Sequence, residues 1–169
     1  MELASAVRDF EEAASDYVAL LDRARDLPRD EFLRGSLELL CRLVVTALRL
    51  PPDDSVPIAL TDDEGDDVER LLETGVEDLL GPAGAYWALP PTIGPDDSDL
   101  NPPIAVGSLA EDLAEIYGAV MPGLLAARRG DAAVAAATWH FGFWSHWGEH
   151  ALEATRAILA ILYAVHRKR

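Results

Sequence analysis

The 169-residue sequence is poor in several features that would each point to a class of protein. It has one cysteine, Cys41, which excludes a disulfide framework and a multi-cysteine zinc site. Its longest apolar run, Ala157–Val165, is nine residues long, whereas a membrane-spanning helix needs about 20. The first ten residues include Glu2, Arg8 and Asp9 and lack the apolar stretch of a secretory signal. We therefore expect a cytoplasmic protein without a membrane partner.

Basic residues are also scarce. The sequence has 14 lysines and arginines against 30 acidic residues, which gives a net charge of −16. Like charge repels the phosphate backbone, so we expect no nucleic-acid partner. The sequence also lacks a glycine-rich phosphate loop, a serine nucleophile elbow and a cysteine nucleophile site. These absences remove common enzyme signatures and leave the function open.

The negative charge is concentrated in the middle third of the chain. Residues 51–101 contain fourteen acidic residues and one basic residue, Arg70, for a net charge of −13. The spacing of carboxylates here fails the EF-hand pattern, because Gly65 is not at the sixth position of the loop. One interpretation is a solvated surface, and another is a face that attracts a basic partner protein. The residues of that acidic face are Asp62, Asp63, Glu64, Asp66 and Asp67.

Apolar residues recur at helical spacing along most of the chain, and alternation with a period of two is almost absent. This pattern predicts an all-α fold, a single-domain bundle of five or six helices over residues 1–169. Ser108 and Glu111 form a capping box at the start of one helix, which Gly130 ends. The last helical segment, about 132–166, is either one bent helix or two helices that meet near Ser145–Gly148. The other helices are expected at about 2–25, 28–49, 61–81 and 108–130.

A proline-rich segment interrupts the helical pattern. Residues 82–107 contain six prolines, and structureless loops of this length are uncommon inside compact domains. The segment also carries apolar side chains such as Tyr86, Trp87 and Leu100. We therefore expect a long loop that covers the bundle. If the loop leaves an apolar patch open, we expect a homodimer.

Residues 139–150 hold three of the four tryptophans and three of the four histidines. On a regular helix the opposite side of this segment is apolar as well, so we expect the helix at the centre of the bundle with its histidines turned inward. Three interpretations stay open: a structural core, a metal site, and a small-molecule pocket. A sector about 100° wide would form the candidate pocket from Trp139, Phe143, His146, Trp147 and His150.

The histidine pair is the basis of the metal interpretation. His146 and His150 are one helical turn apart and point the same way, as paired metal ligands do. Glu153 is a candidate third ligand, and Asp112 or Glu115 on the preceding helix would complete the set. No motif requires a cofactor, and a divalent metal is the one that this cluster would take.

Two more specific enzyme patterns fail. Residues 146–150 match the H-x-x-E-H string of inverted zinc proteases, but only 19 residues follow, too few for the further acidic ligand. The acidic residues on the two C-terminal helices also suggest a magnesium-dependent nucleotide pyrophosphohydrolase. The full pair of motifs is absent, and Glu111 is already explained as a capping residue.

The C-terminal half contains a set of motifs at Val106–Tyr117, Gly130–Asp131, Ser145–Ala151 and Arg156–Ala157. Through these motifs the chain resembles a bacterial family known as domain of unknown function 5063. The resemblance is clearest from about Val106 to Ile161, and the Tyr86–Trp87 pair also fits it. It implies an all-helical domain of bacterial origin and no activity, because the family has none established.

These observations favour a non-catalytic protein-interaction module of the immunity or adaptor type, with an acidic face for a basic partner. The alternative is a metal- or cofactor-dependent enzyme that uses His146 and His150 with the nearby carboxylates. The two differ in what the imidazoles face. A catalytic pair must open onto a cavity rather than onto packed side chains.

Overall fold

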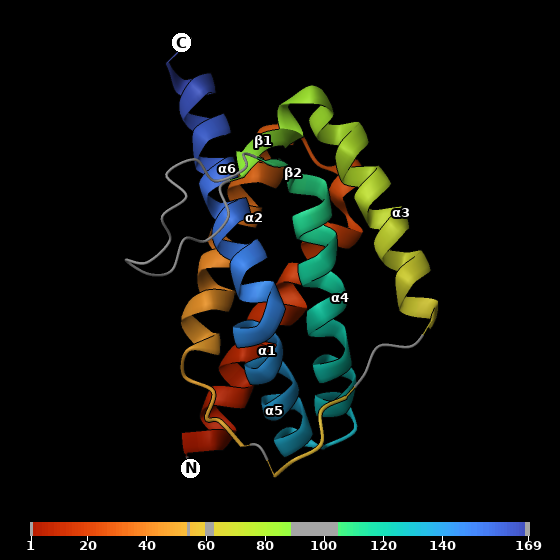
Figure 1. Ribbon diagram of the computed structural model, residues 1–169, viewed down its shortest axis with the longest axis vertical. Helices are drawn as coiled ribbons and strands as arrows, with labels where there is room; N and C mark the ends of the chain where they lie inside the picture. The colour runs from red at the N-terminus through yellow and green to blue at the C-terminus, as the bar shows by residue number, and fades with distance from the viewer. Residues whose placement is uncertain (1, 54, 60–62, 89–104, 168–169) are drawn as a thin grey trace, which may run out of the picture.

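The structure, a computed structural model, is a bundle of long helices with a short β-hairpin at one end (Figure 1). It describes residues 2–53, 55–59, 63–88 and 105–167. The prediction of a mostly helical fold is confirmed, whereas the pair of strands departs from the all-α expectation. The described elements are α1 (Glu2–Asp22), η1 (Ala24–Asp26), α2 (Arg29–Ala47), α3 (Asp63–Leu80), η2 (Gly81–Gly84), β1 (Ala85–Ala88), β2 (Ala105–Ser108), α4 (Leu109–Arg128), α5 (Ala132–Gly142), η3 (Phe143–Trp147) and α6 (Gly148–His166).

Helices α1 and α2 pack against each other through the apolar stripes predicted from the sequence. Phe10, Tyr17 and Leu21 of α1 are buried, as are Phe32 and Leu40 of α2. Removing a side chain of this size from water stabilises the fold by about 1.5–3 kcal/mol. The two helices therefore form one half of the core.

Helix α4 is central and packs against α1, α3, α5 and α6. Its start is fixed as predicted, because the backbone N–H of Glu111 donates to the Ser108 hydroxyl at 3.3 Å. Tyr17 of α1 donates to the carbonyl of Leu113 at 2.8 Å and fixes the same end again. At the other end, Gly130 has φ of +88° and ends the helix. Ser108 and Tyr17 therefore fix the first two turns of α4, and Gly130 fixes where the helix ends.

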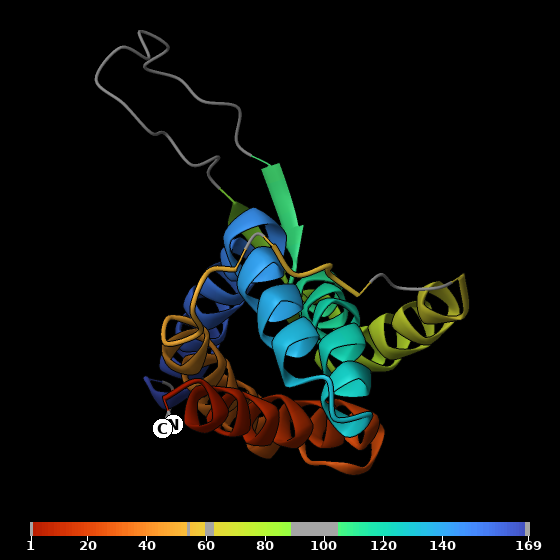
Figure 2. The same cartoon turned by 90° about the horizontal axis from the view of Figure 1, so that it is seen from below.

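The described ends of the proline-rich segment are strands rather than loop. β1 and β2 pair antiparallel, with Tyr86 opposite Gly107. The hairpin lies at one end of the bundle (Figure 1) and projects from its side (Figure 2). A Cβ atom on Gly107 would lie 2.5 Å from the Tyr86 ring, so this position requires glycine. Residues 89–104 lie outside the described residues. The expected cover, and the homodimer that depends on it, therefore stay predictions.

Segments α5, η3 and α6 form one helical rod that includes a turn of π-helix, η3, between Gly142 and Gly148. Only one side of the rod is buried: Trp139 and Trp147 pack against Phe10, with ring centroids 4.6 and 5.9 Å apart. The expectation of a rod buried on all sides is therefore wrong, because its outer side faces no other described helix. The exposed large side chains of that outer side are Phe141, Trp144, Leu152, Leu159 and Tyr163.

Among the described residues, no helix is both long enough and apolar enough to cross a membrane.

Candidate metal-binding site

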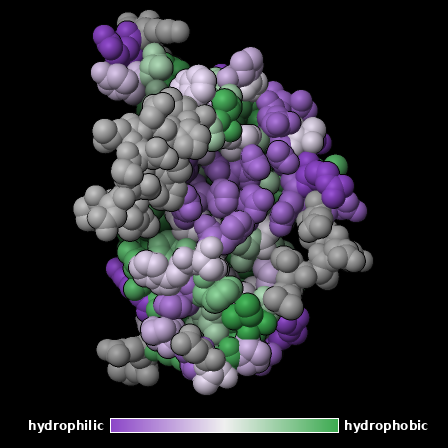
Figure 3. Space-filling model, viewed as in Figure 1, coloured by the Kyte–Doolittle hydropathy of each residue, from purple (hydrophilic) through white to green (hydrophobic). Residues whose placement is uncertain are grey.

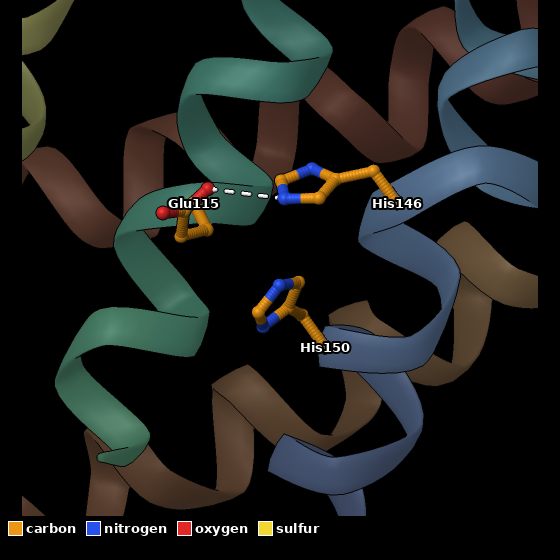
Figure 4. A group of neighbouring side chains, drawn as sticks. All are labelled: Glu115, His146 and His150. Carbon is orange, nitrogen blue, oxygen red and sulfur yellow. Dashed lines mark ion pairs between the residues drawn. The ribbon is translucent and has the colours of Figure 1, made fainter. Parts of the chain in front are cut away.

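The two histidines of the rod face α4 rather than the core. His146 projects from η3 and His150 from the first turn of α6, and both approach Glu115 of α4 (Figure 4). The Nε2 atom of His146 lies 3.4 Å from Oε2 of Glu115. Each of the three side chains offers one ligand atom, and these atoms all lie within 4.8 Å of one another. The three residues form a cluster that we call the His–Glu site.

The His–Glu site is open to solvent on one side. The side chains of His146 and Glu115 are 50% and 39% exposed, whereas that of His150 is 31% exposed. The surface over α4 and α6 on this side of the molecule is hydrophilic (Figure 3). The expectation that both histidines turn inward is therefore wrong: His150 is half-buried, and His146 lies at the surface.

Asp112 lies behind His150 and holds it by a hydrogen bond. Nδ1 of His150 is 2.9 Å from Oδ1 of Asp112, whose side chain is only 8% exposed. An ionised carboxylate accepts hydrogen bonds only, so Nδ1 carries the proton that is donated to it. In the neutral ring this leaves the lone pair on Nε2 free to bind another group. Figure 4 shows one ring nitrogen of His150 directed toward the space beside His146 and Glu115.

The hydrogen bond to Asp112 raises the pKa of His150 above its ordinary value. Partial burial of the ring opposes this effect, and the negative charges of Asp112, Glu115 and Glu149 add to it. The protonated ring is therefore stabilised in the absence of another cation. The raised pKa reflects a negative local potential, which would also attract a metal ion.

Tyr86 of the β-hairpin completes the contacts of Asp112. Its hydroxyl donates to Oδ2, the second oxygen of the carboxylate. Burial raises the pKa of Tyr86 well above its usual range, and the hydrogen bond and charge of Asp112 raise it further. The hydroxyl therefore keeps its proton and acts as a donor. Sequence reasoning assigned Tyr86 to the proline-rich loop and missed this role.

Arg156 of α6 attaches the hairpin to the rod. Its Nη2 atom donates to the backbone carbonyl of Trp87 at 3.0 Å, and the guanidinium lies 5.8 Å from the centre of the Tyr86 ring. Glu153, predicted as a metal ligand, lies 3.6 Å from Arg156 and forms an ion pair with it. The role of Arg156 was also missed. Its place in the Arg156–Ala157 motif of the family resemblance is the signal that could have identified it.

The structure separates the residues predicted to line one pocket. Trp139, Phe143 and Trp147 are buried in the core, while His146 and His150 lie at its edge. His140, Phe141 and Trp144 line a hollow of about 500 Å³ together with residues of the 53–58 segment. The three buried aromatic side chains therefore belong to the core, and the candidate pocket that combines them with the histidine pair stays a prediction.

The predicted acidic face lies at the start of α3. Asp63, Glu64, Asp66 and Asp67 belong to this helix, and Asp62 lies outside the described residues. Asp67 is exposed and pairs with Arg70 at 3.3 Å. The acidic face is therefore separate from the His–Glu site, since the site is built from α4 and the rod.

Comparison with known proteins identifies the fold and the family. The structure is similar to the crystal structure of protein BF1032 from Bacteroides fragilis, with a TM-score of 0.71 and 21% sequence identity over 92% of this chain and 91% of that chain. At this identity the similarity shows the fold alone. No curated protein matches the sequence. The model of domain of unknown function 5063 (DUF5063) matches residues 2–164, and the chain belongs to this family.

Proposed function

We propose that this protein binds a divalent transition-metal ion through Glu115, His146 and His150. The observation that carries the proposal is the convergence of these three side chains from α4 and the rod, with ligand atoms within 4.8 Å. Two imidazole nitrogens and a carboxylate oxygen are a donor set found in zinc enzymes. Bonds of about 2.1 Å in a tetrahedral site separate ligand atoms by roughly 3.4 Å. The distance of 3.4 Å between Nε2 of His146 and Oε2 of Glu115 already matches this separation.

The contact between Asp112 and His150 supports the same proposal. A histidine that binds a metal usually donates its other ring N–H to a carboxylate, which fixes the tautomer and orients the ring. Asp112 stands in that relation to Nδ1 of His150. Imidazole ligands favour zinc, iron, cobalt or nickel over magnesium and calcium. The proposed ion is therefore of the zinc type, and the magnesium-dependent alternative loses support.

The exposure of the site supports a catalytic rather than a structural ion. Structural zinc sites have four protein ligands and are closed, whereas catalytic sites have three and keep a position for water or substrate. The His–Glu site has three ligand groups, of which His146 is half exposed. Its chemistry would be metal-assisted hydrolysis or a related reaction at the open position. This favours the enzyme alternative over the non-catalytic one.

Metal analysis of the protein tests the proposal directly. The protein is purified without a histidine tag, analysed for bound elements, and titrated with Zn²⁺, Fe²⁺, Mn²⁺ and Co²⁺. We expect one Zn²⁺ or Co²⁺ per chain, a tetrahedral Co²⁺ absorption spectrum, and at least about 100-fold weaker binding in His146→Ala and His150→Ala, because each removes a ligand. His140→Ala is the matched control, since His140 lies on the same rod outside the cluster.

Two results would contradict the metal proposal. One is absence of binding to the wild-type chain. The other is a His146→Ala or His150→Ala variant that binds as tightly as wild type and only melts at a lower temperature. Either result would make the histidines structural partners of Glu115 and Asp112.

A second candidate function is binding of a basic protein at the acidic side of the bundle. Partial burial and the negative charges of Glu77, Glu111 and Glu115 raise the pKa of Glu73, so carboxylates of α3 and α4 lie close enough to repel one another. A basic partner would relieve this repulsion. The test compares proteins captured by wild type and by a variant with Asn or Gln at the five positions of the acidic face (62, 63, 64, 66 and 67) and with Gln at Glu73 and Glu77. Capture of no partner, or of acidic partners alone, would count against this function.

A further inference from the structure

We propose that metal binding at the His–Glu site is coupled to the docking of the β1–β2 hairpin, with Asp112 as the shared residue. The inference rests on the proposed metal site and adds a regulatory element to it. Asp112 is not a ligand in this account. It is a positioning residue that connects a ligand, His150, to the hairpin.

The connection begins with the two oxygens of one buried carboxylate. Oδ1 of Asp112 accepts from Nδ1 of His150 at 2.9 Å, and Oδ2 accepts from the hydroxyl of Tyr86. The Asp112 side chain is 8% exposed, so water has little room to replace either donor. If Tyr86 loses its hydroxyl while its ring stays in place, an oxygen of the carboxylate is left buried without this partner, and the orientation of Asp112 is no longer fixed from both sides.

The hairpin is attached to the bundle close to this carboxylate. Arg156 donates to the carbonyl of Trp87 at 3.0 Å, and its guanidinium lies over the Tyr86 ring. Gly107 of β2 lies opposite Tyr86, and the absence of a side chain there lets the Tyr86 ring lie across the strand. The pairing of the two strands therefore sets the position of the Tyr86 hydroxyl.

The polypeptide backbone provides a second connection between the hairpin and Asp112. β2 ends at Ser108 and α4 begins at Leu109, so the hairpin leads directly into the helix turn that carries Asp112. Ser108 also caps that turn through the backbone N–H of Glu111. A displacement of the hairpin would act on Asp112 through both the Tyr86 hydroxyl and the start of α4.

A bound metal would strengthen the same contacts from the opposite direction. Coordination of Nε2 withdraws electron density from the imidazole, so its Nδ1–H becomes a better donor to Asp112. Asp112 is then held in the orientation in which Oδ2 accepts from the hydroxyl of Tyr86. Because coupling between two sites is reciprocal, a docked hairpin favours the metal, and the metal favours a docked hairpin by the same factor.

The test measures both directions of the coupling with zinc as the probe. Tyr86→Phe removes the hydroxyl and keeps the ring, whereas Gly107→Ala places a methyl group where the ring lies. We expect each variant to bind Zn²⁺ about 10–100-fold more weakly, the range typical for loss of an outer-shell partner. Trp87→Phe is the matched control and should bind as wild type, because its side chain is exposed and its carbonyl is retained.

The reciprocal measurement is amide hydrogen exchange with and without saturating Zn²⁺. In wild type, we expect zinc to slow exchange at residues 85–88 and 105–108, and in Tyr86→Phe this protection should be lost. The wild-type measurement needs no variant, so it holds even if a substitution disturbs folding. A purely structural Tyr86 would lower the melting temperature of the variant but leave zinc affinity and zinc-dependent exchange unchanged.

The outcomes separate the two proposals. If wild type binds no zinc, the metal site and the coupling both fail. If wild type binds zinc, but Tyr86→Phe binds it equally well and zinc leaves exchange in the hairpin unchanged, the coupling alone is overturned.

Discussion

At two interfaces between helices, the carboxylates pair with different basic side chains. Between α1 and α2 the cation is arginine: Arg42 lies 2.8 Å from Asp16 and 3.6 Å from Glu12. Between α4 and the rod the partners are histidines, His150 for Asp112 and His146 for Glu115. The first interface has a permanent charge on the basic side, and the second has one that depends on pH.

This difference determines what each interface can do. The guanidinium of arginine keeps its proton at physiological pH and has no lone pair to offer, so its ion pairs can only stabilise the fold. A histidine can lose its proton and give the same nitrogen to a metal ion. The α1–α2 pair is therefore a structural contact, and the contact between α4 and the rod has the chemistry of a site.

The largest expected effect tests whether a carboxylate paired with histidine binds metal and one paired with arginine does not. We expect Glu115→Gln to weaken Zn²⁺ binding by about 100-fold or more, or about 2.7 kcal/mol, because the ligand loses its charge. Glu12→Gln is the matched substitution in the arginine interface and should leave the affinity unchanged. Isothermal titration calorimetry measures both. Equal losses in the two variants would remove the distinction between the interfaces.

The second prediction compares the two aspartates in folding stability. Asp112 is buried and accepts from His150 and Tyr86, whereas Asp16 is half exposed. Asp112→Ala should lower the free energy of unfolding by about 1.5–3 kcal/mol, and Asp16→Ala by less than about 1 kcal/mol. Urea denaturation of the metal-free proteins measures the two losses. If Asp16→Ala lowers the free energy of unfolding as much as Asp112→Ala does, then burial does not make the two interfaces differ in stability.

The third prediction concerns pH. As the pH rises, the stability of the metal-free protein should fall, whereas its affinity for zinc should rise. The pKa of His150 is raised by Asp112, so its contribution to stability is fully present below the unfolded pKa of roughly 6.5 and is lost as the pH rises through the folded pKa. Zinc affinity should rise over the same range, because the metal competes with a proton for the ring. Unfolding and zinc titrations between about pH 6 and 9 check both signs.

His150→Gln is the control for this pH dependence. In the variant, the part of the pH-dependent stability that belongs to the histidine should disappear. The arginine interface should contribute no change over this range, since arginine does not titrate there. A pH profile identical in wild type and His150→Gln would show that the His150–Asp112 contact does not contribute.

The smallest expected effect is on the arginine interface. Arg42→Met should lower the free energy of unfolding by about 0.2–1 kcal/mol, because the ion pairs are partly exposed. The loss should shrink in high salt, which screens exposed charges. A double-mutant cycle with Asp16→Asn in urea isolates the pair. A coupling energy well above this range would make the arginine interface a major source of stability.

Local signals in the sequence were sufficient to predict the helices. The helical spacing of apolar residues and the Ser108 capping box each depend on residues within a few positions of one another. The hairpin was missed because its strands are four residues long, too short for alternation to be visible, and because Ala85 pairs with the distant Ser108. Strand pairing of this kind depends on tertiary contacts that the local pattern does not contain.

The histidine pair was predicted from its spacing, but its environment was not. The sector calculation assumed 100° per residue throughout, which places His146 with Trp139. The π-helical turn breaks that period. Trp139, Phe143 and Trp147 are buried at intervals of four residues, so the histidines fall beside the buried side of the rod rather than on it. The different roles of Asp112 and Glu115 likewise depend on how α4 meets the rod.

The π-helical turn therefore sets the angular phase between the two halves of the rod. If the same five residues, Phe143–Trp147, formed a regular α-helix, all of α6 would be rotated by about 90° relative to α5, because a π-helical turn contains more residues than an α-helical turn. His150 would then leave α4, although every side chain of the His–Glu site would still be present in the sequence. The backbone geometry of this one turn, rather than any ligand, decides which side of α6 meets α4.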